Sequence, residues 1–189
     1  IVLKSNYADA YSNLGNTLRQ QGRLIEAEAS FKQAINFEPN YAEAHSNLGN
    51  ILREQGRLIE AEASYKKAIV LKPNFVNAYS NLGVLLKDIG KLNESCSAFI
   101  KAINLNPHFT DAYANLGKAI KNVRFNSSNV NLYPIFIKLL ISNNFARPED
   151  LANSICSLLK HDPLIKNSLL EENFPTNLKE LNSLINSLN

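Results

Sequence analysis

Apolar residues recur along the first part of the chain at steps of three and four residues, the spacing that puts side chains on one face of an α-helix. Two such stripes lie on either side of Gly22: Tyr11, Leu14 and Leu18 before it, and Leu24, Ala27, Phe31 and Ala34 after it. Glycine interrupts helices and supplies tight turns. The pattern therefore predicts a helix, a turn and a second helix.

This helical pair recurs with a period of 34 residues. Residues 8–41 and 42–75 are identical at 24 of 34 positions, and residues 42–75 and 76–109 at 15 of 34, with no gap in either comparison. A fixed period of this length predicts a solenoid, in which each unit buries its apolar face against its neighbours. We number positions within a repeat from Ala8, Ala42, Val76 and Thr110.

The period also sets the expected domain boundaries. Proline cannot continue a helix, and one proline closes each copy, at Pro39, Pro73 and Pro107. Residues 8–41, 42–75 and 76–109 are then three full repeats, and residues 110–122 keep the first helix of a degenerate fourth. Residues 1–7 align with residues 69–75, so they are expected to be the tail of a truncated upstream repeat.

A glycine lies in the middle of each first helix, at Gly15, Gly49, Gly83 and Gly117. Glycine inside a helix costs about 1 kcal/mol relative to alanine, so a packing reason is expected. The small residues at position 20 of the second helix would supply it by close approach; they are Ala27, Ala61 and Ser95.

The last third of the chain loses the repeat. Residues 123–131 are expected to form a loop, and residues 132–189 three or four helices. The first runs from Pro134 to Ile141, the second begins at Pro148, the third begins at Asp162 and Pro163, and the last carries apolar residues from Leu178 to Leu188. The second helix has a stripe to bury, made of Leu151, Ile155, Leu158 and Leu159. Because the end of a solenoid exposes apolar surface, this region is expected to be a cap or a connector to a further domain.

The repeated segment YSNLGNTLRQQGRLIEAEASFKQAINFEP resembles the tetratricopeptide repeat in its aromatic, Leu-Gly, Gly, Ala, aromatic, Ala and Pro positions. The resemblance implies an all-α fold, a right-handed superhelix of helix pairs. It also implies that the first helices line a concave groove that binds proteins or peptides. The chain would then be an interaction scaffold rather than an enzyme.

Position 6 of every first helix is asparagine: Asn13, Asn47, Asn81 and Asn115. Asparagine competes with its own helix backbone, so its recurrence there suggests a purpose other than helix stability. Its amide can both donate to and accept from an extended peptide. The row resembles the asparagine ladder in the repeat arm of O-linked N-acetylglucosaminyltransferases. Inheritance by duplication is the alternative explanation.

Position 12 is basic throughout, with Arg19, Arg53, Lys87 and Lys121, and Asn16 and Asn50 at position 9 lie between the two rows. If the basic row takes part in binding, a partner with acidic segments is favoured; a solvated face is the alternative. The carboxylate clamp of some tetratricopeptide proteins needs Lys at position 5. Here that position is serine or alanine, which disfavours that class of partner.

Composition excludes several other functions. The net charge of +3 is too small to indicate nucleic-acid binding, and no apolar run is long enough for a membrane span. Cys96 and Cys156 are far apart and lack histidines at ligand spacing, which favours neither a disulfide framework nor a metal site. Two buried thiols in a reducing compartment fit a cytoplasmic protein. No catalytic group or cofactor-binding motif is evident.

The alternative function is a substrate-recruiting arm of a larger glycosyltransferase or methyltransferase. The segment RPEDLANSICSLLKHDPLIKNSLLEENF is similar to a region of bacterial proteins that join such repeats to a methyltransferase-like domain. This chain has none of the cofactor-binding glycines that such a domain needs. Under this alternative, the catalytic domain would lie outside the chain.

Overall fold

The computed structural model describes residues 2–121, 123, 132–141, 145, 148–159 and 161. Within these residues the secondary structure is helical, with no strand, which confirms the all-α prediction. The helices are α1 (Val2–Gln20), α2 (Leu24–Phe37), α3 (Ala42–Glu54), α4 (Leu58–Leu71), α5 (Val76–Asp88), α6 (Leu92–Leu105), α7 (Thr110–Ile120), α8 (Tyr133–Ile141) and α9 (Pro148–Leu159). Contacts divide the chain into two compact units, residues 1–91 with 104–106, and residues 92–103 with 107–189.

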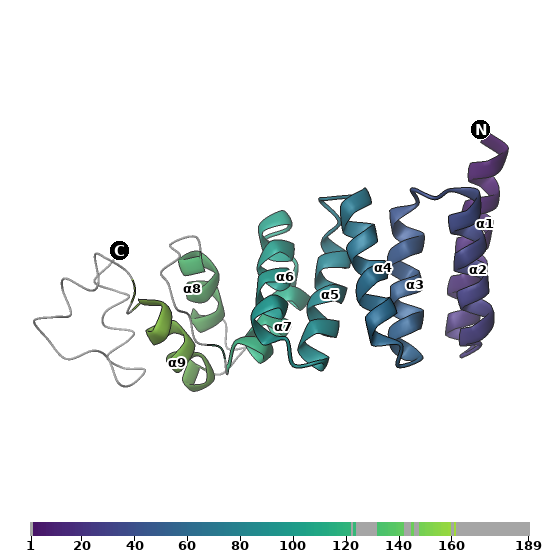
Figure 1. Ribbon diagram of the computed structural model, residues 1–189. Coiled ribbons are helices and arrows are strands. Elements are labelled where there is room, and N and C mark those ends of the chain that lie inside the picture. Colours follow the sequence, from purple (N-terminus) through teal and green to yellow (C-terminus); the bar gives the residue numbers. More distant parts are fainter. Residues whose placement is uncertain are drawn as a thin grey trace, which may run out of the picture. The chain divides into compact units, whose positions relative to one another are not determined.

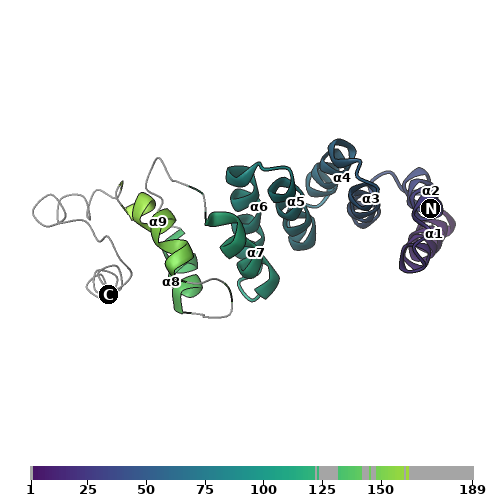
Figure 2. The same ribbon diagram turned by 90° about the horizontal axis from the view of Figure 1, so that it is seen from below.

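The first unit is a stack of helix pairs (Figure 1). Helix α1 packs on α2 and α3 packs on α4, while α2 contacts α3 and α4 contacts α5. The first helices also touch one another, α1 to α3 and α3 to α5. Figure 2 shows the result: α1, α3 and α5 form one row, and α2 and α4 form the other. Equivalent positions of successive first helices are therefore neighbours.

The turn inside each repeat depends on a glycine with a left-handed backbone. Gly22 has φ 73° and Gly56 has φ 76°, a region that residues with a side chain rarely adopt. At the first turn, the amide of Arg23 donates to the carbonyl of Leu18 at 2.9 Å, which closes the end of α1. A Cβ on Gly22 would meet nothing within 4 Å, so glycine is required there by conformation and not by space.

The mid-helix glycines have a different role, since an aromatic ring of the second helix lies against them. A Cβ on Gly15 would lie 2.8 Å from the ring of Phe31, and one on Gly49 would lie 2.7 Å from the ring of Tyr65. The nearest side chains are thus the aromatic rings at position 24 and not the small residues at position 20. Both rings are fully buried, and a ring laid flat against the first helix leaves no room for a methyl group.

Helix α1 begins earlier than the repeat predicts. Residues 2–7 were expected to be the tail of another repeat, but they continue α1 without a turn. The repeats close their second helices before a proline, whereas Ser5 stands at the position equivalent to Pro73. Serine keeps its backbone amide, so nothing interrupts the helical hydrogen bonds here.

In the second unit, α9 packs against α7 and α8. The stripe of α9 is buried as predicted, with Leu151, Ile155, Leu158 and Leu159 each at most 5% exposed. The hydroxyl of Ser154 donates to the carbonyl of Ile120 at 2.5 Å, which ties α9 to the end of α7.

Helix α8 is attached to the start of the fourth first helix. The ammonium of Lys138 lies 4.3 Å from the ring centroid of Tyr113 and donates to the carbonyl of Pro107 at 2.8 Å. The ring of Phe145 also stacks on the ring of Tyr113, with 5.4 Å between the ring centroids. The expected loop at 123–131, except residue 123, and the expected helices after residue 161 lie outside the described residues. None of the described helices is long and apolar enough to cross a membrane.

Candidate functional site

The position-6 asparagines of the first unit lie on the three adjacent first helices. Asn13 on α1 is exposed, and Asn47 on α3 and Asn81 on α5 are half-buried. Within the part of the chain that the structure describes, none of the three amide side chains has a hydrogen-bond partner. We call these three residues the asparagine row. Asn115, on α7 in the second unit, is half-buried and also unpartnered among the described residues.

An unpartnered amide row can bind a ligand without first breaking a protein contact. Each amide offers two N–H donors and one carbonyl acceptor. Because the first helices touch in sequence, successive amides present these groups once per repeat. The main chain of an extended peptide offers the same donor and acceptor types, so the chemistry is complementary.

Asn50, at position 9 of the second repeat, differs from the asparagine row because its side chain has a hydrogen-bond partner within the protein. The hydroxyl of Tyr65 donates to Asn50 Oδ1 at 2.8 Å. Burial raises the pKa of Tyr65 to about 12, and the positive charges of Arg53 and Arg19 oppose that rise. Asn16 occupies the same position in the first repeat, but residue 31 is a phenylalanine and has no hydroxyl to offer.

The basic row at position 12 is largely engaged with carboxylates. Arg19 contacts Glu54 of the next repeat, with Nε 2.9 Å and Nη2 2.5 Å from Oε1. Arg53 repeats this contact more loosely, with Nη1 4.0 Å from Oδ2 of Asp88, and Lys87 Nζ lies 3.6 Å from Oδ1 of the same residue. Lys121, in the second unit, is exposed. Among the described residues of the first unit, two carboxylates thus offset three basic side chains and leave the row one positive charge in excess.

The carboxylates at position 13 are the functional neighbours that the sequence reasoning missed. Glu54 and Asp88 each follow a basic residue of their own repeat directly, so they look like local counter-charges. Glu54 instead pairs with Arg19 of the repeat before. Asp88 pairs both with its neighbour Lys87 and with Arg53 of the repeat before, because the first helices lie side by side. The pairs Arg19–Glu54 and Arg53–Asp88 both join opposite charges that are one repeat plus one residue apart in the sequence.

Two acidic residues at position 2 are likewise partnered. Asp9 Oδ1 accepts a hydrogen bond from the hydroxyl of Tyr41 at 2.7 Å, and burial together with this bond raises the pKa of Tyr41 to about 12. Glu43 Oε1 lies 2.6 Å from Nζ of Lys72. These carboxylates are thus satisfied by their own repeat.

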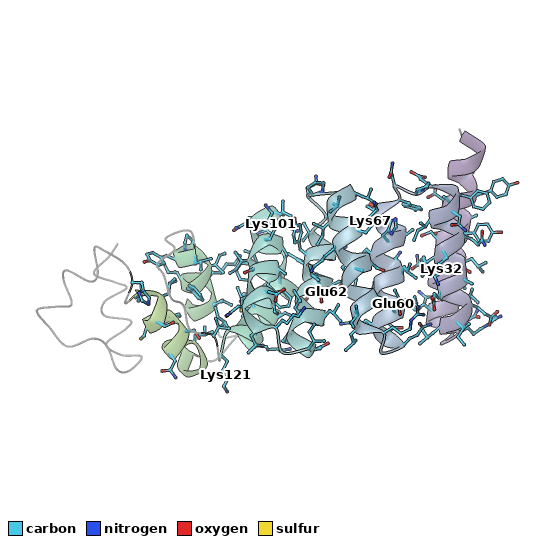
Figure 3. All side chains as sticks on the ribbon, viewed as in Figure 1. Lys32, Glu60, Glu62, Lys67, Lys101 and Lys121 are labelled. Atoms are coloured by element: carbon cyan, nitrogen blue, oxygen red, sulfur yellow. The ribbon has the colours of Figure 1, made fainter. Side chains whose placement is uncertain are left out.

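The second helices carry a further set of ion pairs, away from the asparagine row. Glu28 on α2 contacts Lys32 and Arg57, each at 2.7 Å, and Glu62 on α4 contacts Lys66 at 2.6 Å and Lys91 at 3.1 Å. Figure 3 labels Lys32 and Glu62 among the side chains of these helices. In both cases one partner belongs to the next repeat, so the pairs hold successive repeats in register.

The site lacks the lysine of a carboxylate clamp. Position 5 is Ser12, Ser46 and Ser80 in the first unit, and all three are buried at 2–6% exposure. A lysine in these places would need to leave the interior. This agrees with the expectation that the carboxylate-clamp type of partner is disfavoured.

Chemically reactive groups are dispersed. His45 is half-buried, with Nε2 2.9 Å from the carbonyl oxygen of Pro39. Cys96 is buried, and burial raises the pKa of its thiol to about 12, whereas Cys156 is only half-buried. No cluster of three or more potential metal ligands occurs among the described residues.

Comparison with protein families matches the repeats directly. A family model described as "TPR repeat" matches residues 15–52 and 49–90, and one described as "Tetratricopeptide repeat" matches residues 76–109. No curated protein matches the chain in sequence.

Many solved structures share the fold. The first TPR of Spaghetti (RPAP3), bound to the HSP90 peptide SRMEEVD, is 23% identical over 61% of this chain and 91% of its own, with a TM-score of 0.59. MamA is 24% identical over 72% of this chain and 75% of its own, with a TM-score of 0.60. The second TPR domain of human RPAP3, in complex with the HSP70 peptide SGPTIEEVD, is 22% identical over 62% and 95%, with a TM-score of 0.56. By its repeats and its fold, this chain belongs to the tetratricopeptide-repeat family.

Proposed function

We propose that this chain is an interaction scaffold that binds extended peptide segments along the first helices of its first unit. The asparagine row carries the proposal. Asn13, Asn47 and Asn81 occupy one position on three touching helices, and their amides are unpartnered among the described residues. Two solved relatives of the same fold hold peptides, which supports the class of ligand.

The expected affinity is modest. A peptide main chain that satisfies the three amides gains about 0.5 to 1.5 kcal/mol for each hydrogen bond. Ordering the peptide offsets part of that gain. A dissociation constant in the micromolar range, equivalent to roughly 8 kcal/mol, therefore also requires side-chain contacts beyond the asparagines.

The partner need not be acidic. Arg19 and Arg53 already face Glu54 and Asp88, so an acidic peptide would have to compete with carboxylates of the protein. Surface ion pairs are screened by salt, whereas hydrogen bonds to neutral amides are not. We therefore expect peptide binding to change little between low and physiological salt, and an acidic sequence to give no systematic advantage.

The test replaces Asn13, Asn47 and Asn81 together by alanine. A random library of peptides with blocked ends is selected on the wild-type protein, and the tightest binder is then used as the probe. The triple variant should bind this probe at least about tenfold more weakly, since three hydrogen bonds are removed. Its folding should not suffer, because alanine is a better helix former than asparagine.

The matched control replaces three exposed asparagines elsewhere in the same unit, Asn36, Asn40 and Asn74. This control should bind the probe as the wild type does. Equal affinity of the wild type and the triple variant would remove the proposed site. Asn115→Ala, measured separately, reports whether the second unit takes part.

A recruiting arm of a larger enzyme would use the same surface. Its additional requirement is a catalytic domain in the parent protein, which the reading frame beyond residue 189 would reveal.

A further inference from the structure

The hydrogen bond between Tyr65 and Asn50 makes one amide of the second repeat unlike the others. The ring of Tyr65 is fully buried and lies so close to Gly49 that a Cβ there would come within 2.7 Å of it. Ring and hydroxyl are therefore held in one place. The hydroxyl reaches the half-buried side chain of Asn50, to whose Oδ1 it donates at 2.8 Å.

The direction of this bond follows from what the hydroxyl needs. Tyr65 has no other hydrogen-bond partner among the described residues. If the Asn50 amide were turned over, its NH2 group would face the hydroxyl, and the buried phenolic proton would lose its acceptor. An unsatisfied buried donor costs about 1 to 3 kcal/mol, which favours the carbonyl facing inward.

The nitrogen of the same amide is left open. Among the described residues, every buried side-chain nitrogen or oxygen has a hydrogen-bond partner. Asn50 Nδ2 has no hydrogen-bond partner there, so this nitrogen must be accessible to solvent. Because Oδ1 already accepts from the buried Tyr65 hydroxyl, the N–H donors of Nδ2 are the part of the Asn50 amide that is left without a partner. Such a group can bind a carbonyl oxygen but cannot accept from an amide.

The other repeats differ from the second at position 9 or at its neighbour at position 24. In the first repeat Asn16 has the same position, but Phe31 replaces the tyrosine, so that amide is not held and can turn to suit either partner. In the third repeat, position 9 is Val84, which has no amide. A fixed donor is thus confined to the second repeat.

We infer that Tyr65 is a positioning residue for peptide binding: it holds Asn50 as a one-way donor that takes a main-chain carbonyl of the bound peptide. This inference rests on the proposed function of the first-helix surface. Its consequence is that the peptide is read in a defined register at the second repeat, while the flexible amides of the asparagine row accept either direction.

The first experiment needs no ligand. Side-chain order parameters of the asparagine NH2 groups are measured by ¹⁵N relaxation in the wild type, in Tyr65→Phe and in Phe31→Tyr. Phenylalanine occurs at position 24 in the other repeats, so the first variant is expected to fold. In the wild type, we expect a higher order parameter for the Asn50 amide than for the Asn16 amide. In Tyr65→Phe, the order parameter of Asn50 should fall to that of Asn16. In Phe31→Tyr, the order parameter of Asn16 should rise. An Asn50 amide that stays equally ordered without the hydroxyl overturns the inference.

The second experiment measures affinity for the library-selected probe peptide. Tyr65→Phe should weaken binding by about two- to tenfold, the effect of misorienting one hydrogen bond. In an Asn50→Ala background the same substitution should have no further effect, which separates positioning from a general loss of stability. A full loss in that background would show that Tyr65 acts only through the fold. Failure of the proposed function is recognised separately, since it leaves the affinity of the asparagine-row variant unchanged.

Discussion

Arg19 on the first helix of one repeat points both Nε and Nη2 at a single oxygen of Glu54 on the first helix of the next, at 2.9 and 2.5 Å. The looser pair of Arg53 and Asp88 repeats the contact one unit further along. These side chains come from helices that touch, so the contact reports how adjacent repeats are aligned. It also reduces the net charge of the basic row.

Reversing the Arg19 and Glu54 charges tests this alignment. The two side chains are 38% and 32% exposed, which places the pair among surface ion pairs worth about 0.2 to 1 kcal/mol. Arg19→Glu or Glu54→Arg alone should lower the free energy of unfolding in urea by roughly that amount. The double exchange should recover most of the loss. If the double variant is as unstable as the sum of the single ones, the pair does not contribute to stability.

Glu28 is expected to make stability depend on pH in the acid range. Burial raises its pKa, but hydrogen bonds from Lys32, Arg57 and Gln55 outweigh burial and lower the pKa from 4.5 to about 2. A lowered pKa means that the folded state favours the charged form. This stabilisation is complete above pH about 4.5 and is lost as the pH falls towards 2.

The measurement compares Glu28→Gln with the wild type in urea, at neutral pH and at several acid values. The variant should be less stable at neutral pH, and the difference should shrink through the window from about 4.5 to about 2. Glu26→Gln is the matched control, because Glu26 pairs with Arg23 on the surface of the same helix. A constant difference at all pH values would show that the charge of Glu28 is not responsible.

Gly49→Ala tests the close approach of the Tyr65 ring. Alanine should gain about 1 kcal/mol of helix propensity, but a Cβ within 2.7 Å of the ring forces a displacement that costs about 1 to 3 kcal/mol. We expect a net loss of stability in thermal or urea unfolding. In a Tyr65→Ala background the ring is absent, and the same substitution should become stabilising. Destabilisation of similar size in both backgrounds would place the constraint elsewhere.

The sequence was sufficient for features that recur within one helix. The spacing of Leu151, Ile155 and Leu158 predicts a buried stripe, and the structure confirms it. The glycines of the turns and the prolines after the second helices predict where helices end, because both act on the backbone locally. The start of α1 is the converse case, since residue 5 is a serine where the other copies have proline, and residues 2–7 are helical.

Contacts between repeats were harder to predict. The Arg19 side chain has acidic candidates in its own repeat and in the next, and only the lateral packing of α1 on α3 selects Glu54. The helical spacing places Phe31 in an apolar stripe, and the ring of Tyr65 packs at the equivalent position, but its hydroxyl has a second role. A tyrosine replacing phenylalanine between otherwise similar copies was the available signal.

The ion pairs between repeats that the structure describes join residues 29 or 35 places apart in the chain, as in Arg57 with Glu28 and Arg19 with Glu54. No more distant part of the sequence is needed to form these contacts. A further copy of the 34-residue unit inserted into the stack would bring both halves of each contact with it. The number of repeats in such a solenoid can thus change by whole units during evolution, because each added unit brings the residues that pair with its neighbours.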